Sequence, residues 1–289
     1  MALNRRSSST HSSPSDSPQD VRAPSALKLL LEARAPSEWA ALLAAAPWLR
    51  QLPNGDGHPV IVFPGLAATD LSTVPLRRFL EDRGYVAYPW RQGFNFGPRD
   101  GVLEACAAQV REVAARHRCK LSLIGWSLGG VYAREMARAQ PDLVRCVVTL
   151  GSPFAGHPRA TNAWRVYELV SGRKVDADPA LLAQLALPPP VPTTSIYSRS
   201  DGVVAWQCSI NPDAPKAENI EVHASHLGMG VNPLALYAIA DRLAQPPDDW
   251  QRFHLDGARR WFYKTTHATA VGSTGGADST DTARNARAA

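Results

Sequence analysis

Continuously apolar runs that alternate with helix-like stretches constrain the fold of this chain more than any other feature. The runs are short, rich in β-branched residues and free of polar–apolar alternation, as in 59–65 (PVIVFPG) and 120–125 (KLSLIG). Strands without alternation are buried on both faces, which is typical of parallel sheets covered by helices. Further strands are expected within the segments 86–90, 146–153, 193–202 and 219–225, and helices within 71–85, 101–118, 128–140 and 232–245. This order predicts an α/β fold with a mostly parallel sheet and helices on both faces.

The two ends of the chain differ in composition from this central part. Residues 1–24 are rich in Ser and Pro, and residues 265–289 are mostly small and polar. Segments with so few apolar residues cannot form a core, so we expect both to be disordered. The folded domain is then 25–264, and it begins with a helical stretch, 26–50, that Pro36 divides into two helices.

Charge and composition exclude several classes of function. The chain of 289 residues has a net charge of +5 without any basic run, so no nucleic-acid partner is expected. It contains no apolar stretch long enough to span a membrane and no apolar region behind its basic N-terminus, which favours a cytoplasmic protein. The four cysteines lack the spacing of a metal site. Cys119 and Cys146 each precede an apolar run, and buried free thiols are favoured there over a disulfide.

The sequence GWSLG, residues 125–129, places Ser127 between an expected strand and an expected helix. A sharp turn there brings the residues two before and two after the serine close to it, so Gly125 and Gly129 leave room for the turn to close. The helix N-terminus then directs free backbone N–H groups at the same point. Ser127 is therefore the candidate nucleophile, although a turn that simply needs small residues is the plainer interpretation.

A serine nucleophile needs a base that takes its proton, and that base is usually a histidine oriented by a carboxylate. In G-x-S-x-G enzymes the carboxylate and then the histidine follow the serine in the chain. Of the eight histidines, only His223 and His226 occupy a suitable place. His226 is favoured because it follows the strand 219–225, whereas His223 is expected inside that strand, in the packing.

The carboxylate is expected between the serine and the histidine in the sequence. Asp201 follows the strand that starts at residue 193, and the carboxyl ends of parallel strands carry the chemistry in such sheets. Asp213 is the competitor, but its NPDAP context is typical of a turn. We therefore favour Asp201.

An oxyanion intermediate would need preorganised N–H donors beside the serine. One donor is expected from the backbone of Leu128, directly after the serine, and the other from the loop that follows an early strand. The sequence VFPGLAATD ends such a strand, and Gly65 allows the backbone to approach closely. Leu66 is therefore the second expected donor, with an ordinary Pro-Gly turn as the alternative.

At this point the chain resembles the α/β-hydrolases, and more narrowly their bacterial lipases and esterases. The resemblance rests on VFPGLAATD, GYVAYPWRQGFNFGP, LIGWSLGGVYAREMAR, VVTLGSPFAG, YSRSDGVV and ASHLGMGVNP, which together cover about residues 59–240. It implies an α/β-hydrolase fold, ester hydrolysis through an acyl-enzyme, a triad of Ser127, Asp201 and His226, and no metal or organic cofactor. The chain departs from the secreted members in showing no signal peptide.

The interval 155–191 is too long for a simple loop and contains two potential short helices, so we expect a lid there. Five aromatic residues are candidates for lining the substrate site, although local packing explains them equally well: Phe94, Phe96, Trp126, Trp164 and Tyr167. The N-terminal helical stretch, with Leu30 and Trp39, can contact a membrane surface, but docking on the domain is favoured.

These expectations point to a hydrolase for a small or lipid-like ester with an apolar acyl part. An acyltransferase or thioesterase with the same three residues is the first alternative, and a binding protein on an inactive hydrolase scaffold is the second. The oligomeric state has no signature in the sequence.

Overall fold

Seven strands form one sheet in the computed structural model of this protein, which describes residues 21–171 and 179–266. The strand order is β2-β1-β3-β4-β5-β6-β7, and all neighbours are parallel except β6 and β7. The strands are β1 (Pro59–Phe63), β2 (Val86–Pro89), β3 (Leu121–Trp126), β4 (Val144–Leu150), β5 (Thr193–Tyr197), β6 (Ala217–Glu221) and β7 (Lys264–Thr265). The mostly parallel sheet expected from the sequence is therefore confirmed.

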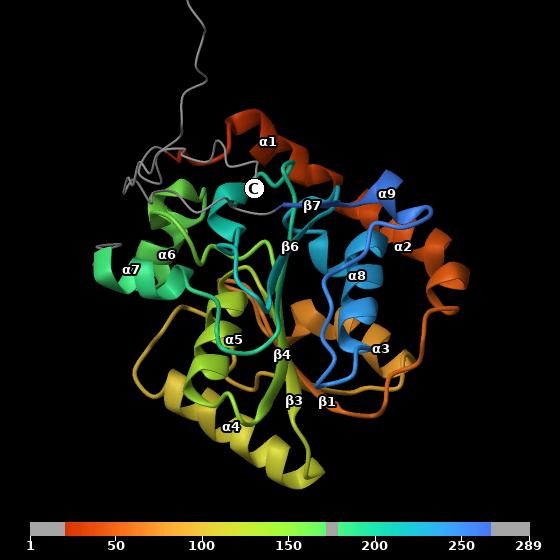
Figure 1. Ribbon diagram of the computed structural model, residues 1–289. Coiled ribbons are helices and arrows are strands. Elements are labelled where there is room, and N and C mark those ends of the chain that lie inside the picture. Colours follow the sequence, from red (N-terminus) through yellow and green to blue (C-terminus); the bar gives the residue numbers. More distant parts are fainter. Residues whose placement is uncertain (1–20, 172–178, 267–289) are drawn as a thin grey trace, which may run out of the picture.

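Helices cover both faces of this sheet. The α-helices are α1 (Ala26–Leu30), α2 (Ala35–Leu49), α3 (Val74–Asp82), α4 (Val102–His117), α5 (Leu128–Ala139), α6 (Trp164–Ser171), α7 (Pro179–Ala186), α8 (Pro233–Leu243) and α9 (Arg259–Phe262). Short 3₁₀ helices are η1 (Leu31–Arg34), η2 (Asp70–Thr73), η3 (Pro158–Ala160), η4 (Trp206–Ser209) and η5 (Met229–Val231). Figure 1 shows the sheet nearly edge-on, with α4 and α5 on one side and α2, α3 and α8 on the other.

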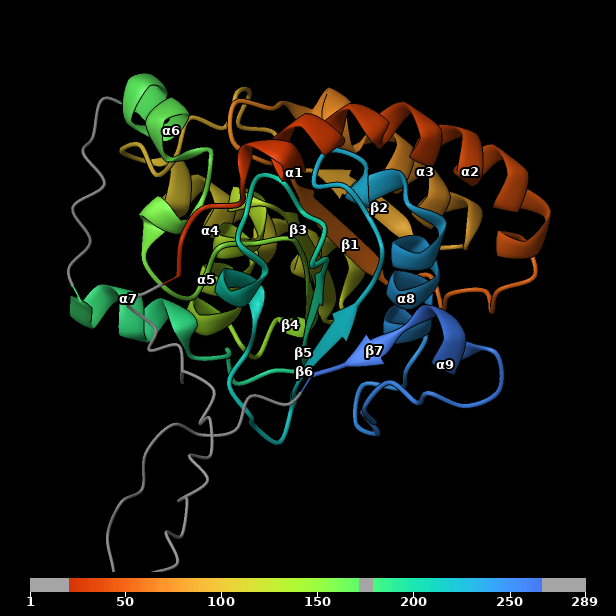
Figure 2. The same cartoon turned by 90° about the horizontal axis from the view of Figure 1, so that it is seen from above.

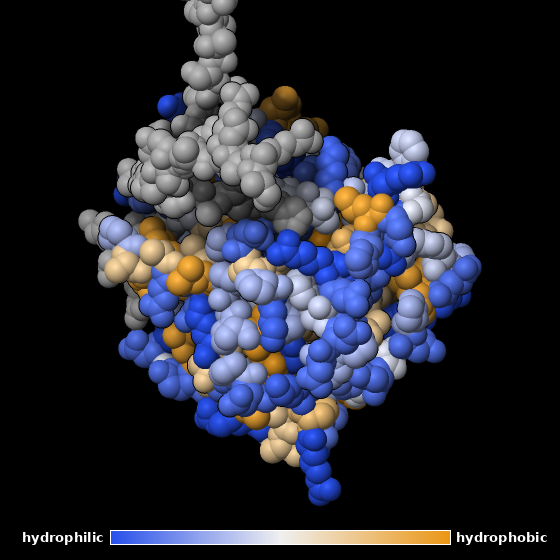
Figure 3. Space-filling model, viewed as in Figure 1, coloured by the Kyte–Doolittle hydropathy of each residue, from blue (hydrophilic) through white to orange (hydrophobic). Residues whose placement is uncertain are grey.

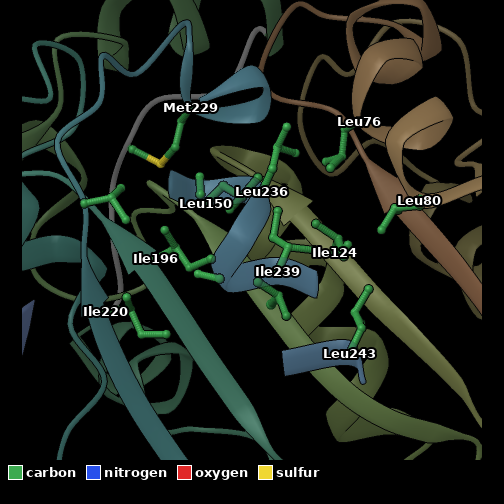
Figure 4. Packing of buried hydrophobic residues seen from close by; sticks show 14 of the residues in the cluster. Leu76, Leu80, Ile124, Leu150, Ile196, Ile220, Met229, Leu236, Ile239 and Leu243 are labelled. Carbon is green, nitrogen blue, oxygen red and sulfur yellow. The ribbon is translucent and has the colours of Figure 1, made fainter. Parts of the chain in front are cut away.

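The apolar strands supply a separate core to each face. Val60 and Val62 belong to the cluster that α3 and α8 cover, whereas Ile61 and Phe63 belong to the cluster under α4 and α5. Successive side chains of a strand point to opposite faces, so a strand buried on both faces must be apolar throughout. Figure 4 shows the first cluster, in which Ile239 of α8 packs among strand residues.

The direction in which successive strands are added to the sheet reverses between β1 and β3. β1 lies between β2 and β3, so the chain leaves β1 in one direction and later returns to its other side. In open α/β sheets, ligands bind at such a switch point, outside the carboxyl ends of the strands. The turns that follow β1 and β3, which hold Leu66 and Ser127, both lie there.

Several expected boundaries differ from the structure. β6 ends at Glu221, so His223 lies past the strand, exposed, and not in the packing as expected. Pro36 lies in the first turn of α2 and so marks the start of that helix as predicted. All four cysteines are free, and Cys119 is exposed instead of buried.

The ordered chain also extends beyond the expected limits of the domain. Pro24, placed in the N-terminal tail by its composition, accepts a hydrogen bond from Asn162 at 3.0 Å. Thr265, placed in the C-terminal tail, pairs with Ile220 as part of β7. The rest of the two expected tails, 1–20 and 267–289, lies outside the described residues.

The interval 155–191, where the sequence predicts a lid, contains the α-helices α6 and α7 in its described residues, and residues 172–178 lie outside them. The end of α7 rests on Arg134 of α5, whose guanidinium donates to the carbonyl oxygens of Ala186 and Leu187 at 3.1 and 2.8 Å. Arg134 is fully buried over the ring of Phe154, with its guanidinium carbon 3.7 Å from the ring centroid. Figure 2 shows α6 and α7 on the same side of the sheet, apart from each other.

Hydrophilic side chains cover most of the face seen in Figure 3, and the hydrophobic ones are scattered among them. Among the described residues, no helix is both long and apolar enough to cross a membrane.

Candidate active site

Ser127 occupies a strained turn between β3 and α5. Its backbone has φ 53° and ψ −124°, a conformation that L-residues rarely adopt. A Cβ on Gly125 would lie 2.3 Å from the carbonyl oxygen of Gly129, and a Cβ on Gly129 would lie 2.3 Å from that of Phe63. Only glycine fits at either position, at Gly125 because of the turn itself, as inferred from the sequence, and at Gly129 because of the neighbouring end of β1. The turn leaves the Ser127 side chain partly exposed above the sheet.

His226 and Asp201 form a hydrogen-bonded chain with this serine. His226 Nε2 lies 2.9 Å from Ser127 Oγ, and His226 Nδ1 lies 2.7 Å from Asp201 Oδ2. Gly151, at the end of β4, makes room for the pair, since a Cβ there would lie 3.0 Å from Asp201 Oδ2. The three residues chosen from the sequence therefore meet in one place.

The second oxygen of Asp201 is held by the backbone. Asp201 Oδ1 accepts hydrogen bonds from the N–H groups of Val203 and Val204, both at 2.8 Å. Because these bonds orient the carboxylate, Oδ2 is presented to His226. Both side chains are nearly inaccessible, Asp201 at 3% and His226 at 4% exposure.

The electrostatic surroundings of His226 favour its protonated form. Burial by itself would lower the pKa of His226, but the carboxylate of Asp201, with a contribution from Glu32, outweighs burial and raises that pKa above its usual range. A base with a raised pKa holds a transferred proton more firmly.

The turn after β1 lies directly beside the serine. A Cβ on Gly65 would be 3.3 Å from Ser127 Cβ, so this turn contacts the nucleophile. Within the described chain, the N–H groups of Leu66 and Leu128 donate to no protein acceptor, so both are available to a bound group.

Asn95 holds that turn in place, a function that the sequence analysis missed. It is fully buried, and its Nδ2 donates to the carbonyl oxygen of Pro64 at 2.8 Å. Its backbone exchanges hydrogen bonds with the turn, accepting from Ala67 N and donating to Ala68 O. The FNFG segment could have suggested only that an Asn near two Phe residues forms a turn.

Glu32 is a second residue that the sequence analysis missed. It lies in η1, 4% exposed, and its carboxylate accepts hydrogen bonds from backbone N–H groups on both sides of the Asp201–His226 pair. An isolated Glu in an apolar helical stretch carries no signal of such a function.

The competing candidates lie elsewhere. His223 is exposed, and the side chain of Asp213, 56% exposed, pairs with Arg252 at 2.9 Å. Neither residue has a contact with Ser127, Asp201 or His226 among the described interactions.

The expected pocket residues have different surroundings. Phe94 is 54% exposed and stacks on Phe96 with ring centroids 5.4 Å apart. Tyr167 of α6 packs against Gly97, where a Cβ would lie 2.8 Å from its ring, so α6 contacts the same segment as the Phe pair. Trp164, partly buried, lies under the guanidinium of Arg159.

Trp126 binds the backbone of His226. Its indole Nε1 donates to the carbonyl oxygen of His226 at 3.0 Å, and its ring packs against Gly230 and the buried core. A contact between Trp126 and the substrate stays a prediction.

A second Ser–His–Asp array lies near the amino end of β3, the end opposite to Ser127. His58 Nε2 is 2.8 Å from Ser122 Oγ, and His58 Nδ1 contacts Asp56. Ser122 is the second residue of β3 and is fully buried, so no substrate can approach its hydroxyl. Hydrogen-bond order alone therefore does not identify a nucleophile, and the exposed turn at Ser127 distinguishes the two serines.

Comparison with known proteins relates the chain to lipases. No protein-family model matches it. Over 109 residues it is 36% identical to a triacylglycerol lipase from Pseudarthrobacter phenanthrenivorans. The match covers 34% of this chain and 34% of that protein, so the chain spans about a third of the length of the curated relative.

Solved structures share the fold over a longer part of the chain. Aspergillus fumigatus lipase B superimposes with a TM-score of 0.52 and 18% identity, covering 69% of this chain and 57% of that one. A Bacillus licheniformis lipase gives a TM-score of 0.51 and 14% identity, covering 68% of this chain and 95% of that one. With the parallel sheet and the serine turn after β3, these matches identify the chain as an α/β-hydrolase in fold.

Proposed function

We propose that this protein is a serine hydrolase that cleaves carboxylic esters through an acyl-enzyme. The observation that carries the proposal is the chain of contacts from Ser127 Oγ to His226 Nε2 and from His226 Nδ1 to Asp201, built on a strained and partly exposed serine turn. The lipase names of the relatives support the same reaction class.

In the proposed reaction, Ser127 Oγ attacks the ester carbonyl carbon while His226 Nε2 takes the hydroxyl proton. The carbonyl oxygen becomes an oxyanion, which the N–H groups of Leu66 and Leu128 stabilise. Asp201 holds His226 in the tautomer that presents Nε2 to the serine and stabilises its protonated form.

Collapse of the tetrahedral intermediate breaks the bond to the alcohol, which leaves with the proton from His226. Water then attacks the acyl-enzyme, giving its proton to His226, and a second collapse releases the carboxylic acid and restores Ser127. No group outside the three side chains and the two N–H donors is required for these steps.

The substrate is proposed to have an apolar acyl part. The stacked pair Phe94 and Phe96 and the lid residue Tyr167 place aromatic surface on one segment, 94–97, which is directly tied to the Leu66 turn by Asn95. Apolar walls with few polar groups are typical of sites for lipid-like ligands.

A panel of p-nitrophenyl esters from acetate to palmitate, assayed with wild type and Ser127→Ala, tests this proposal. We expect hydrolysis by wild type, loss in the variant, and covalent labelling of Ser127 by a fluorophosphonate in wild type only. The matched control is Ser122→Ala, which removes a buried hydroxyl of the same type. Folded wild type that neither hydrolyses any ester nor takes up the label would exclude the proposal.

Adding a competing alcohol or thiol to the assay addresses the acyltransferase alternative. Under the proposed function the free acid is the main product, because water reaches the acyl-enzyme. A dominant new ester or thioester would assign the same three residues to acyl transfer instead.

A further inference from the structure

We propose that Glu32, from the N-terminal helical segment, is a positioning residue that locks the Asp201 and His226 loops into their working arrangement. The catalytic part of this proposal rests on the proposed function. The pKa of His226, which is the main quantity to be measured, can be determined whether or not the protein cleaves esters. Nothing in the spacing of the triad residues requires such a contact, since Glu32 lies far before them in the chain.

One carboxylate joins the two loops at the reacting residues themselves. Glu32 Oε1 accepts hydrogen bonds from Gly202 N at 2.8 Å and from His226 N at 3.0 Å. Glu32 Oε2 accepts from Leu227 N at 2.9 Å. Gly202 follows the carboxylate residue of the site, so a single side chain fixes the backbone on both sides of the Asp201–His226 contact.

The neighbours of Glu32 in the same segment bind the same two loops. Arg34 donates to the carbonyl oxygens of Ser200 and Ala224, at 3.0 and 2.8 Å. Glu38 Oε1 accepts from Ser225 N at 2.6 Å. Lys28 donates to Arg199 O at 2.9 Å. Together with Glu32, these three side chains bind both loops. We call the four side chains, which lie within residues 28–38, the clamp.

The loops, in turn, are shaped to accept the clamp. A Cβ on Gly202 would lie 2.2 Å from Lys28 O, and a Cβ on Gly228 would lie 2.1 Å from Glu38 Oε2. Neither glycine has a positive φ, so these positions require glycine for space and not for backbone conformation. Figure 1 shows α1 near the end of β6 from which the His226 loop begins.

A carboxylate is the chemical group suited to this position. Three N–H donors converge on its two oxygens, and a carboxylate accepts several hydrogen bonds without offering a donor of its own. A Gln at residue 32 would turn an NH₂ group toward at least one of these N–H groups. An Asp would keep the charge but end one carbon short.

The charged groups around His226 come from three elements. Asp201, in the loop after β5, contacts Nδ1, and Glu32 of η1 binds the His226 backbone. Glu38 of α2 binds the preceding residue and is itself paired with Arg34 at 3.8 Å. Asp201 and Glu32 both act to favour protonated His226. Removing the charge of Glu32 is therefore expected to lower the pKa of His226, an effect that a merely structural residue would not have.

The test compares wild type with Glu32→Gln, Glu32→Asp and the control Glu218→Gln in the full chain. Glu218, the second residue of β6, is buried to a similar degree but binds Arg242 and Thr194. The readouts are the acid limb of kcat/KM for p-nitrophenyl butyrate and an NMR titration of His226 in each protein.

For Glu32→Gln we expect kcat/KM to fall by about 10- to 100-fold, as small misplacements of reacting groups cause. We also expect its acid limb and its His226 titration to move to lower pH. Glu218→Gln should lose thermal stability and keep both titrations at the wild-type position. Titrations that coincide in Glu32→Gln and wild type would overturn the proposal, leaving Glu32 as a purely structural residue.

Two further outcomes are also decisive. If Glu32→Gln does not fold, Glu32→Asp is used in its place. For Glu32→Asp we expect a reduced kcat and an acid limb of kcat/KM at the wild-type pH. An unchanged kcat in Glu32→Asp would overturn the positioning function. If wild type cleaves no ester, the proposed function fails separately, and the NMR titration alone confirms or refutes the effect of Glu32 on His226.

Discussion

Asn95 Nδ2 donates to the carbonyl oxygen of Pro64 at 2.8 Å, joining the segment after β2 to the turn after β1. The same turn contains Ala67, whose φ of 55° is unfavourable for a residue with a side chain. A hydrogen bond of 2.7 Å from Ala67 N to Asn95 O helps to hold it. The expected oxyanion donor at Leu66 therefore depends on a residue almost thirty positions further along the chain.

Replacing Asn95 is expected to reduce kcat with little change in KM. Asn95→Ala removes the bond to Pro64 O and leaves a buried carbonyl without a donor, which costs about 1–3 kcal/mol of folding stability. It also frees the turn that carries Leu66, and loss of one oxyanion donor lowers kcat by about 10²- to 10³-fold. Steady-state kinetics and denaturant unfolding measure the two effects.

Asn219→Ala is the control for that experiment. Asn219 is also a buried, hydrogen-bonded Asn, but it binds Asn211 and Thr266 at the far end of the sheet. We expect a comparable loss of stability and a kcat near that of wild type. Equal losses of kcat in the two variants would mean that stability, and not the turn, explains the effect of Asn95.

Activity is expected to rise with pH through the pKa of His226. The base must be neutral to accept the Ser127 proton, and Asp201 and Glu32 raise its pKa above 6.5 against the opposing effect of burial. The acid limb of kcat/KM should therefore lie above pH 6.5, with a plateau at higher pH. An acid limb of kcat/KM below pH 6.5 in wild type would contradict the raised pKa of His226.

Asp201→Asn tests the origin of that raised pKa. Without the carboxylate, burial dominates, so the pKa of His226 should fall and the acid limb should move to lower pH. The value of kcat should also fall, by about 10⁴-fold, because an Asn in this position stabilises the wrong tautomer of the histidine. The measurement is a kcat/KM profile over pH 4–9 with both proteins.

The sequence was sufficient to predict the parts of the site that depend on steric rules along the chain. Gly125 indicated the serine turn because its close contacts, with Gly129 and Gly130, are local to that turn, whereas the close contacts of Gly129 are with Phe63 and Pro64 at the end of β1. Asp201 and His226 could be placed because both follow strands of a parallel sheet, whose carboxyl ends share one edge. The alternation of apolar strands and helices likewise predicted the layers.

Contacts between distant segments could not be predicted in this way. Glu32 and Asn95 act on backbone groups of other loops, and backbone donors and acceptors are the same at every residue, so no residue type indicates which will be bound. The expected burial of His223 was wrong for a related reason. β6 ends two residues before it, and a strand end is set by pairing with neighbours and not by the residue itself.

Arg134 is expected to anchor the lid. Its guanidinium binds the last carbonyls of α7 and Asn211, so Arg134→Met should free the end of α7 while filling most of the same volume. We expect faster amide hydrogen exchange over residues 182–187 and a changed preference for acyl chain length. Arg138→Met is a milder comparison, because Arg138 is nearer the surface and binds the same end of α7. An exchange pattern identical to wild type in Arg134→Met would exclude this anchor.

The array around Ser122, in which Ser122 and His58 are buried and Asp56 is exposed, predicts a stability effect without a catalytic one. Burial lowers the pKa of His58 despite its contact with Asp56. Although burial of Asp56 acts in the opposite sense, Arg145 and His58 hold the pKa of Asp56 well below its usual range. A histidine with a lowered pKa destabilises the folded state as pH falls below 6.5, and a carboxylate with a lowered pKa loses its stabilising effect as pH falls below about 3.8. The free energy of unfolding should therefore decrease from pH 7 to pH 3.

Ser122→Ala separates this effect from catalysis. His58 Nε2 loses its hydrogen bond from the serine hydroxyl in a fully buried place, which costs about 1–3 kcal/mol of stability. Ester hydrolysis per folded molecule should stay at the wild-type level, because the site at Ser127 lies at the other end of β3. Urea unfolding at pH 7 and pH 5, with the p-nitrophenyl ester assay, checks both statements. A large loss of hydrolysis in Ser122→Ala, with the fold intact, would show that the two arrays are coupled through the strand that joins them.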